Sequence, residues 1–499
     1  MYKFIKIFFI TYTITTFCSL SSNAQLVSDF RVNDDLTNHA HYAAKVGCDS
    51  AGNFVVVWYD ERSSGNPRIC GQIFNQYAQN IGDYFQVNND IYQALPSLYV
   101  RKDGSFIVAW SVIQTKFRIF NKNGIPISDE IIISDTSGSI TSIGGDSLGN
   151  FVIAWEQYNA NFMKQVYCQI LNSKGNLIGQ KIKVNDDTGN NTHKNPSITV
   201  RQDGSFIVTW MDSRPPSMDN ADDIYMQLFD KIGNKIGVNQ RVNDDFQTAN
   251  LQRTPKISSD TSSSFIISWT DNRVYLENSD IFAQMYFFNG NKNGNNFIVT
   301  QSSTDNAKGI CNVVNRPNGE FLIAWSEFRP NIPLPYFQRY TDSGIRIGND
   351  FLVTSEFTSA NKYYSDVALF EDRIISVWAD ARNGPLDIYC NIRSYSNPDT
   401  TVNIIQTSSN IPGKFSLAQN YPNPFNNSTQ INFEINQSGI YKLDVYDNLG
   451  QKINEVLNKN LSVGSYKINF ESGSLSSGVY HYILSSPKER LVKSFVLLK

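Results

Sequence analysis

Short apolar runs that end in tryptophan recur along most of the chain. In one copy, residues 206–210 read Phe-Ile-Val-Thr-Trp and follow the turn residues Asp203 and Gly204. A period of about 40–55 residues with strand-like content predicts a propeller or a solenoid. All seven tryptophans occupy this one position, so the chain is expected to hold seven structural units. They are Trp58, Trp110, Trp155, Trp210, Trp269, Trp325 and Trp378.

Each unit is predicted to contain four strands. In the fourth unit these are residues 196–200, 206–210, 223–229 and 240–243. Pairs such as Asp-Gly and Gly-Asn lie between the runs, and they suit hairpin turns because such turns need positive φ. Four antiparallel strands per unit is typical of a β-propeller blade.

The second strand of each unit is apolar on both faces. Phe106, Val108 and Trp110 point to one side, and Ile107 and Ala109 point to the other. Both faces must therefore be covered, as they are in a blade between two neighbouring blades. The residue before each tryptophan is often small, which leaves room for a large side chain of the adjacent sheet. The tryptophans are therefore expected to be core residues and not ligand-binding residues.

A fourth-strand signature, an apolar residue followed by a polar one, predicts how the ring closes. It follows the first six tryptophans, at Val87-Asn88, Ile133-Ser134, Val184-Asn185, Val242-Asn243, Val299-Thr300 and Val353-Thr354. The seventh copy is absent after Trp378 and stands instead near the amino terminus, in residues 30–34. We expect residues 28–34 to complete the seventh blade, which removes exposed sheet edges. The predicted fold is all-β: a seven-bladed β-propeller of four-stranded blades, closed by an N-terminal strand.

Composition narrows the range of partners. The 499-residue chain is 18% charged with a formal net charge of −3, which argues against a nucleic-acid partner held by a broad basic surface. Lys3 and Lys6, an apolar stretch over 7–17 and small residues at 22–24 predict a signal peptide over 1–24. No later segment is long and apolar enough to be a transmembrane segment.

Five cysteines remain after residue 24, an odd number at irregular spacing. That pattern is not typical of a disulfide framework. Cys70, Cys168 and Cys390 stand at the same position of the repeat, 12 or 13 residues after a tryptophan. Equivalent positions on separate blades lie far apart, so we expect these three to be small buried core residues.

The chain changes character after the propeller, which is expected to span 25–396. Residues 397–411 are polar and lack the repeat, and they are predicted to be a linker. Residues 412–499 then hold six short strand-like runs, which predict a small β-sandwich. The runs are 429–435, 441–447, 452–457, 465–470, 478–484 and 491–498.

Motifs in this last segment resemble a known family. Residues 420–425 read Asn-Tyr-Pro-Asn-Pro-Phe, 445–447 read Val-Tyr-Asp with Gly450 shortly after, and 475–480 read Leu-Ser-Ser-Gly-Val-Tyr; Lys493 and a terminal Lys499 follow. In this order the motifs resemble the type A C-terminal sorting domain of the type IX secretion system.

The resemblance implies an immunoglobulin-like fold and a partner, the type IX secretion machinery. It also implies Sec-dependent export and then passage across the outer membrane of a Bacteroidetes-type bacterium. The protein is then expected to be secreted or held on the outer cell surface. The repeat is similar to uncharacterised secreted propeller repeats, which implies a fold and no activity.

A second motif follows the tryptophan. Four units share Trp-x-Asp-x-Arg, at the start of the loop between the second and third strands. The candidate ligand-binding residues are Asp60, Arg62, Asp212, Arg214, Asp271, Arg273, Asp380 and Arg382. Strand alternation places them on the same face as interblade turns that contain Asp34, Asp186 and Asp244.

An Asp- and Arg-rich face could bind a glycan or a cation. The alternative is a structural ion pair that holds each loop. Repetition favours this alternative, because one active site needs different residues to converge.

Signatures of catalysis are absent from the sequence. His39, His41, His193 and His481 show no metal-ligand spacing, and no nucleophile elbow or phosphate loop occurs. No catalytic residue, metal or cofactor is predicted. The leading hypothesis is a non-enzymatic recognition module for a glycan, a polymer or a surface protein. A carbohydrate-active hydrolase or lyase and a structural module of a surface complex are the alternatives. A central pocket with two facing carboxylates would favour the hydrolase.

Overall fold

The computed structural model describes residues 25–498 except 36–38, 63–66, 90–94, 112, 135–137, 190, 215–221, 246–249, 262–263, 276–277, 301–305, 330–331, 355–359, 397–403, 409–411, 427, 462, 473–474 and 487. The expected signal peptide, residues 1–24, lies outside the described residues. Gln25–Thr401 forms one compact unit, and Val402–Lys499 belongs to a second.

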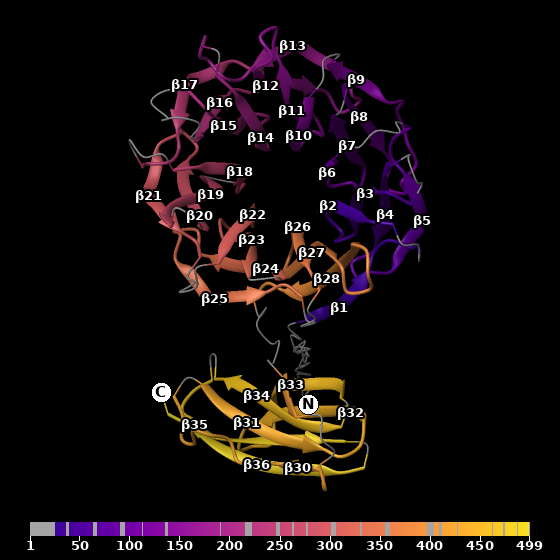
Figure 1. Cartoon of the computed structure of the whole chain (residues 1–499), viewed down its shortest axis with the longest axis vertical. Helices are drawn as coiled ribbons and strands as arrows, with labels where there is room; N and C mark the ends of the chain where they lie inside the picture. Colours follow the sequence, from indigo (N-terminus) through magenta and orange to yellow (C-terminus); the bar gives the residue numbers. More distant parts are fainter. Residues whose placement is uncertain are drawn as a thin grey trace, which may run out of the picture. The chain divides into compact units, whose positions relative to one another are not determined.

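The first unit is a ring of seven four-stranded antiparallel sheets, the blades of a β-propeller (Figure 1). Within blades 1 to 6 the four strands pair in chain order from the centre outward. The inner strands are β2 (His41–Cys48), β6 (Ser97–Val100), β10 (Gly138–Gly145), β14 (His193–Val200), β18 (Gln252–Ser259), β22 (Ala307–Asn315) and β26 (Lys362–Phe370). The second strands are β3 (Phe54–Asp60), β7 (Phe106–Ser111), β11 (Phe151–Tyr158), β15 (Phe206–Asp212), β19 (Ser264–Tyr275), β23 (Phe321–Arg329) and β27 (Arg373–Asp380).

The third and outer strands complete each blade. The third strands are β4 (Arg68–Phe74), β8 (Thr115–Phe120), β12 (Lys164–Leu171), β16 (Asp223–Phe229), β20 (Asn278–Phe287), β24 (Ile332–Tyr340) and β28 (Asp387–Ser394). The outer strands are β5 (Asn80–Gln86), β9 (Ile131–Ser134), β13 (Leu177–Lys183), β17 (Lys235–Arg241), β21 (Lys292–Ile298), β25 (Arg346–Leu352) and, for blade 7, β1 (Gln25–Arg31).

Blade 7 combines both ends of the propeller sequence. Its strand order is β1-β28-β27-β26, and β1 pairs antiparallel with β28, with Phe30 opposite Cys390. Blade 7 also contacts blade 1, because the Val46 amide donates to the Asp366 carboxylate at 3.2 Å. An N-terminal strand therefore supplies the outer strand of the seventh blade. It covers 25–31, three residues earlier than the predicted 28–34.

The outer strands correct one detail of the sequence prediction. The fourth strand of blade 4 was expected at 240–243, whereas β17 ends at Arg241 and the Val-Asn signature follows it. The Val242 amide still donates to the Ile224 carbonyl at 2.8 Å, and the Asn243 side-chain oxygen then accepts from the Ile224 amide at 2.9 Å. The signature therefore marks a side-chain cap that continues the ladder after the backbone turns away.

The seven tryptophans form the packing core between blades. Each is at most 1% exposed. Ala109 lies in one apolar cluster with Trp155, Ala154 in one with Trp210, and Ala324 in one with Trp378. The small residue of one blade therefore makes room for the tryptophan of the next, as the sequence predicts. Cys70, Cys168 and Cys390 are free and buried, also as predicted.

Four inner strands carry a β-bulge at the same place. The register shifts between Tyr42 and Lys45 in β2, and equivalent shifts occur in β14, β18 and β22. A non-glycine residue with φ of 50–55° lies inside each bulge. Such a conformation costs on the order of 1–3 kcal/mol and persists only where its surroundings hold it. The four residues are Ala43, Asn195, Thr254 and Ile310.

The second unit contains two four-stranded sheets around one apolar core. One sheet has the order β29 (Ile404–Ser408), β34 (Gly464–Glu471), β31 (Ser428–Ile435), β30 (Ser416–Leu417). The other has the order β33 (Lys452–Leu461), β32 (Gly439–Tyr446), β35 (Gly478–Ser485), β36 (Arg490–Leu497). All six predicted runs are strands.

Strand β29 lies inside 397–411, which the sequence predicts to be a linker. It pairs with the edge of β34, with Ile404 opposite Ile468. Residues 404–408 therefore belong to the sandwich, since a partner strand about 60 residues away in sequence completes a strand that local pattern does not reveal. The rest of the expected linker lies outside the described residues.

Candidate functional site

The Trp-x-Asp-x-Arg motif places a buried carboxylate at the end of the second strand. Asp60, Asp212, Asp271 and Asp380 are each at most 2% exposed. In blade 4 the Trp210 indole N–H donates to one oxygen of Asp212 at 2.8 Å, and the Arg214 backbone amide donates to the other at 2.9 Å. The same two bonds form in blades 1, 5 and 7. The aspartate therefore satisfies the indole and folds the loop back on itself.

The arginine of the motif forms an ion pair with an aspartate of another chain segment. In blades 1, 4 and 5 this aspartate lies in the turn before the inner strand, and in blade 7 it lies in the outer strand β1. In blade 4 the Arg214 guanidinium is 2.7 Å from Asp212 and 2.7 Å from Asp186, and it lies 4.4 Å from the centroid of the Tyr225 ring. The partners in the other blades are Asp34 for Arg62 at 2.8 Å, Asp244 for Arg273 at 2.5 Å and Asp29 for Arg382 at 3.3 Å. A charged pair stacked on an aromatic ring is a rigid arrangement.

Two histidines complete the network, and no sequence pattern indicates their role. His41 and His193 are fully buried at the start of an inner strand, opposite Asp60 and Asp212. His193 Nε2 lies 2.9 Å from Asp187 and 3.5 Å from Asp212. Only the strand register brings these groups together, because His193 precedes Asp212 by 19 positions. Gln252, Lys308 and Lys362 occupy the same place in blades 5, 6 and 7.

Oppositely charged neighbours in this network shift the pKa values of Asp212 and His41. Burial by itself raises the pKa of Asp212, but His193 and Arg214 outweigh it and lower the pKa to about 2. Burial by itself lowers the pKa of His41, but Asp60, Asp35 and Asp387 outweigh it, so the pKa of His41 is raised. Asp212 is therefore held as an anion by neighbouring donors.

The eight candidate residues do not converge on one point. They form four separate copies of one arrangement, in blades 1, 4, 5 and 7, and every carboxylate is turned inward to protein donors. The structure therefore shows the contacts expected of the structural alternative. In blade 3, which lacks the motif, Gln157 accepts from the Trp155 indole at 3.2 Å in place of the aspartate.

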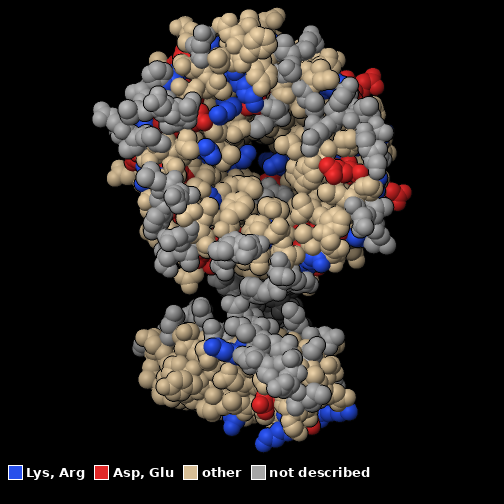
Figure 2. Space-filling view, viewed as in Figure 1, with Lys and Arg blue, Asp and Glu red and all other residues tan. Residues whose placement is uncertain are grey.

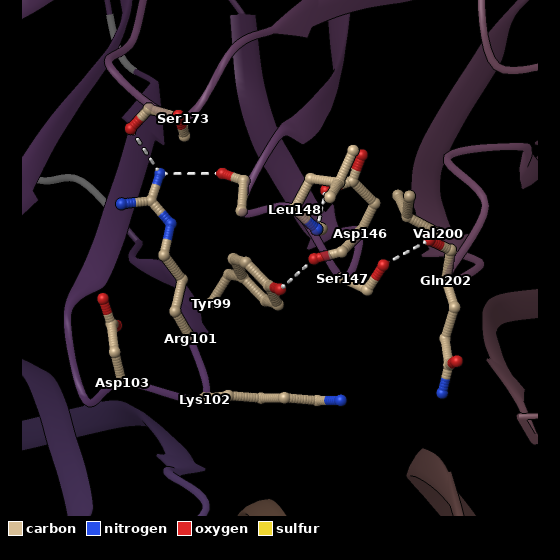
Figure 3. Close-up of a pocket in the computed structure, with 12 residues that line it drawn as sticks. Tyr99, Arg101, Lys102, Asp103, Asp146, Ser147, Leu148, Ser173, Val200 and Gln202 are labelled. Carbon is tan, nitrogen blue, oxygen red and sulfur yellow. Dashed lines mark hydrogen bonds between the residues drawn. The ribbon is translucent and has the colours of Figure 1, made fainter.

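An open hollow of about 320 Å³ lies on the opposite face of the ring. Its walls are the turns between inner and second strands of blades 2, 3 and 4, close to residues 101–105, 146–150 and 201–205 (Figure 3). Tyr99 forms one wall, and a Cβ at Gly145 would lie 2.2 Å from its ring, so glycine is needed there.

Hydrogen bonds from side chains to backbone carbonyls hold the walls of this hollow together. Arg101 donates to the carbonyls of Gly149 and Ser173 at 2.9 and 2.8 Å, and the Ser147 hydroxyl donates to the Gln202 carbonyl at 2.8 Å. The side chain of Lys102 extends from the blade 2 turn toward Gln202 of the blade 4 turn (Figure 3). Both side chains are exposed. They make no hydrogen bond within the described part of the chain.

Two further observations concern only the residues that the structure describes. None of them forms a helix long and apolar enough to cross a membrane. No group of three or more His, Cys, Asp or Glu side chains among them is arranged to hold a metal ion.

Residues 419–498 match the family described as a secretion system C-terminal sorting domain. The match covers the motifs at 420–425, 445–450 and 475–480. In the structure Asn420 is buried and its side chain donates to Thr429 at 2.9 Å, while Phe425 is buried against Phe495, with 5.2 Å between ring centroids. The domain directs export by the type IX secretion system to the cell surface or the extracellular space, so the secretion machinery is a partner of this segment.

Solved structures with similar folds are distant in sequence. A protein of unknown function from Dyadobacter fermentans is 8% identical, with 74% of this chain and 98% of that chain covered and a TM-score of 0.44. A polysaccharide lyase of family PL25, an ulvan lyase, is 10% identical, with 75% and 96% covered and a TM-score of 0.48. The GH93 α-L-arabinofuranosidase of Fusarium graminearum is 11% identical, with 74% and 98% covered and a TM-score of 0.45.

No curated protein matches the sequence of the chain. Identities of 8–11% assign no activity to it.

Proposed function

We propose that the exported propeller is a non-enzymatic recognition module for a glycan, a polymer or a surface protein. The observation that carries this proposal is the hollow between the turns of blades 2, 3 and 4. It combines one aromatic wall, a frame fixed by hydrogen bonds from side chains to backbone carbonyls, and exposed polar side chains that have no partner in the described protein. Such a frame binds a ligand with little ordering cost.

The exposed polar groups of Lys102 and Gln202 can hydrogen-bond to a ligand that is rich in hydroxyl or amide groups. Lys102 supplies a cation and donors, and Gln202 supplies both a donor and an acceptor. The Tyr99 ring adds an apolar surface of the kind that packs against a sugar ring or an aliphatic side chain. Leu148 at the rim is 78% exposed, which adds apolar surface to the edge of the site.

The inner strands support recognition over hydrolysis. Glycoside hydrolysis uses a pair of carboxyl groups about 5–10 Å apart. The seven inner strands, as the structure describes them, contain a single acidic residue, Asp366. Its two oxygens accept from Asn312 and Val46. This arrangement favours a structural role for Asp366 and leaves the carbohydrate-active hydrolase or lyase as the alternative to be tested.

The eight residues of the Trp-x-Asp-x-Arg copies are assigned a structural role in this proposal. Their carboxylates are buried and bonded to the indole, the loop amide and the arginine. A ligand would have to displace those bonds, which are charge-assisted and therefore among the stronger ones in a protein. Ligand contact is assigned instead to the opposite face.

The test is a binding and cleavage screen with the exported chain and a panel of polysaccharides and surface polymers. The expected result is saturable binding of at least one polymer without release of oligosaccharides. Lys102→Ala with Gln202→Ala is expected to weaken that binding about tenfold or more, the loss typical of removing charge-assisted hydrogen bonds. The matched control is Lys122→Ala with Gln79→Ala, which removes an exposed lysine and glutamine from turns outside the hollow.

Release of shortened products by the wild-type chain would favour the enzyme. Equal binding by both double variants would show that the hollow does not contact the ligand.

A further inference from the structure

The inner strands place seven polar residues at one level around the centre of the ring. Each pairs with the residue that precedes the tryptophan on the second strand of its own blade, so all seven are structurally equivalent. We call them the central ring. They are Lys45, Ser97, Ser142, Ser197, Lys256, Asn312 and Asp366.

Five members of the central ring bond to a neighbouring blade. The Ser142 hydroxyl oxygen accepts from the Ile198 amide of blade 4 at 3.1 Å, and Ser197 accepts from the Ile257 amide of blade 5 at 3.3 Å. Ser97 donates to Thr141 of blade 3 at 2.5 Å. Asn312 donates to Asp366. The ring therefore links successive blades through short polar side chains.

Lys45 and Lys256 break this pattern. Both follow a β-bulge, and both are partly buried. Among the described residues neither ammonium group has a hydrogen bond or an ion pair. A partly buried cation without a partner is costly, because burial removes water and supplies nothing in exchange.

The two lysines come from opposite sides of the ring. Their strands, β2 and β18, face each other across the centre (Figure 1). The Lys256 ammonium nevertheless interacts electrostatically with Lys45 of blade 1, and also with Asp366 of blade 7 and Cys311 of blade 6. The two long side chains therefore reach into a common central space, where serine or asparagine would stop short.

The central ring carries a net positive charge. It holds two lysines, Lys45 and Lys256, and one acidic residue, Asp366. Several Lys and Arg side chains border the central opening in Figure 2. An opening with an excess of one sign of charge concentrates ions of the opposite sign. Burial and the nearby Lys45 lower the pKa of Lys256 to about 8, and the nearby Asp366 opposes this shift only in part.

We propose that the central opening of the propeller binds an oxyanion, the group shared by carboxylates, sulfates and phosphates, between the ammonium groups of Lys45 and Lys256. The oxyanion supplies negative charge beside two ammonium groups, where the central ring offers a single carboxylate, Asp366. This site is separate from the hollow of blades 2, 3 and 4, and it does not depend on the function proposed for that hollow.

The first experiment titrates the exported chain with sodium sulfate at pH 7 and low ionic strength, and measures binding by calorimetry. A second arm uses dextran sulfate, which carries the same group on a polymer. Lys45→Met with Lys256→Met is expected to weaken binding about tenfold or more, because each charge-assisted bond is worth about one to two factors of ten. Methionine keeps the apolar stem, and Asp366 keeps its hydrogen bonds from Asn312 and Val46 when both cations are removed.

Two controls separate charge from folding. Lys122→Met with Lys231→Met removes two exposed lysines elsewhere on the propeller and should leave binding unchanged. Lys45→Arg with Lys256→Arg keeps both charges and should retain binding. Sulfate binding to the wild type identifies a free anion as sufficient, and binding of dextran sulfate alone identifies a group presented on a polymer. Wild-type binding in neither arm, or equal binding by the wild type and the methionine variant, would overturn the site.

The pH dependence gives a test on the wild-type chain alone. Sulfate keeps its charge between pH 7 and pH 9.5, so a change of affinity comes from the protein. Lys256 is protonated below its pKa of about 8 and neutral above it. Affinity for sulfate should therefore fall as the pH rises above about 8, because the neutral Lys256 must take up a proton before it can pair with the anion. The same affinity at pH 7 and pH 9.5 would contradict the assignment of Lys256.

Discussion

At the scale of single residues, the Trp-x-Asp-x-Arg motif makes structural contacts within the propeller. Asp212 accepts from an indole, a backbone amide and a guanidinium, and it faces His193. The sequence alone identifies the aspartate and the arginine, since they recur two and four positions after tryptophan. It does not identify the histidine, because a group 19 positions away meets Asp212 only through strand register. The chemical type at that place also varies among histidine, glutamine and lysine.

The structural role of the motif predicts a large loss of stability for Asp212→Ala. The change leaves a buried indole N–H without a partner and removes one carboxylate partner of the Arg214 guanidinium, so the free energy of unfolding should fall by about 3–5 kcal/mol. Denaturant unfolding of the propeller measures this value. Asp129→Ala, at an exposed position, is the control and should change it by less than about 0.5 kcal/mol. A loss at Asp212 no larger than that of the control would show that the network does not hold the loop.

At the scale of strands, alternation predicted where strands lie but not how they end or bend. The outer strands end before their Val-Asn signature, because the Asn side chain replaces the backbone in the last hydrogen bond. The inner strands contain bulges that shift the alternation by one residue. This shift is why the central ring could not be found from a period of two, although each member lies opposite the residue before a tryptophan.

The bulge in β2 predicts opposite effects for two adjacent alanines. Ala43 has φ of 54°, where a Cβ is strained, so Ala43→Gly should be neutral or stabilise the fold by up to about 1 kcal/mol. Ala44 is fully buried and has no such conformation, so Ala44→Gly should destabilise by about 1 kcal/mol or more. Thermal unfolding of both variants checks the sign. An equal loss for the two would contradict a strained bulge at Ala43.

At the scale of the whole molecule, the sequence predicted seven blades, an N-terminal closing strand and a sorting domain. Counting the tryptophans and the fourth-strand signatures was enough for the ring, because each blade repeats one pattern. The hollow and the central ring were not predictable, since they combine residues of different types from several blades. The two proposed sites therefore depend on the few positions where the repeat varies, such as Lys102, Lys45 and Lys256.

Closure of the ring by β1 is the central claim, because the proposed sites depend on a fixed arrangement of all seven blades. Removal of residues 25–31 exposes the edge of β28 and removes Asp29, which accepts from Thr354 at 2.7 Å and Asn391 at 3.0 Å. The control is a chain that lacks residues 402–499, whose propeller keeps all of its strands.

The most direct measurement is hydrogen exchange of the β28 amides, together with thermal unfolding, in both shortened chains. Removal of 25–31 is expected to give fast exchange in β28 and a melting temperature several degrees lower. The control is expected to keep slow exchange in β28. Protected β28 amides and an unchanged melting temperature in the chain without 25–31 would contradict closure by the N-terminal strand.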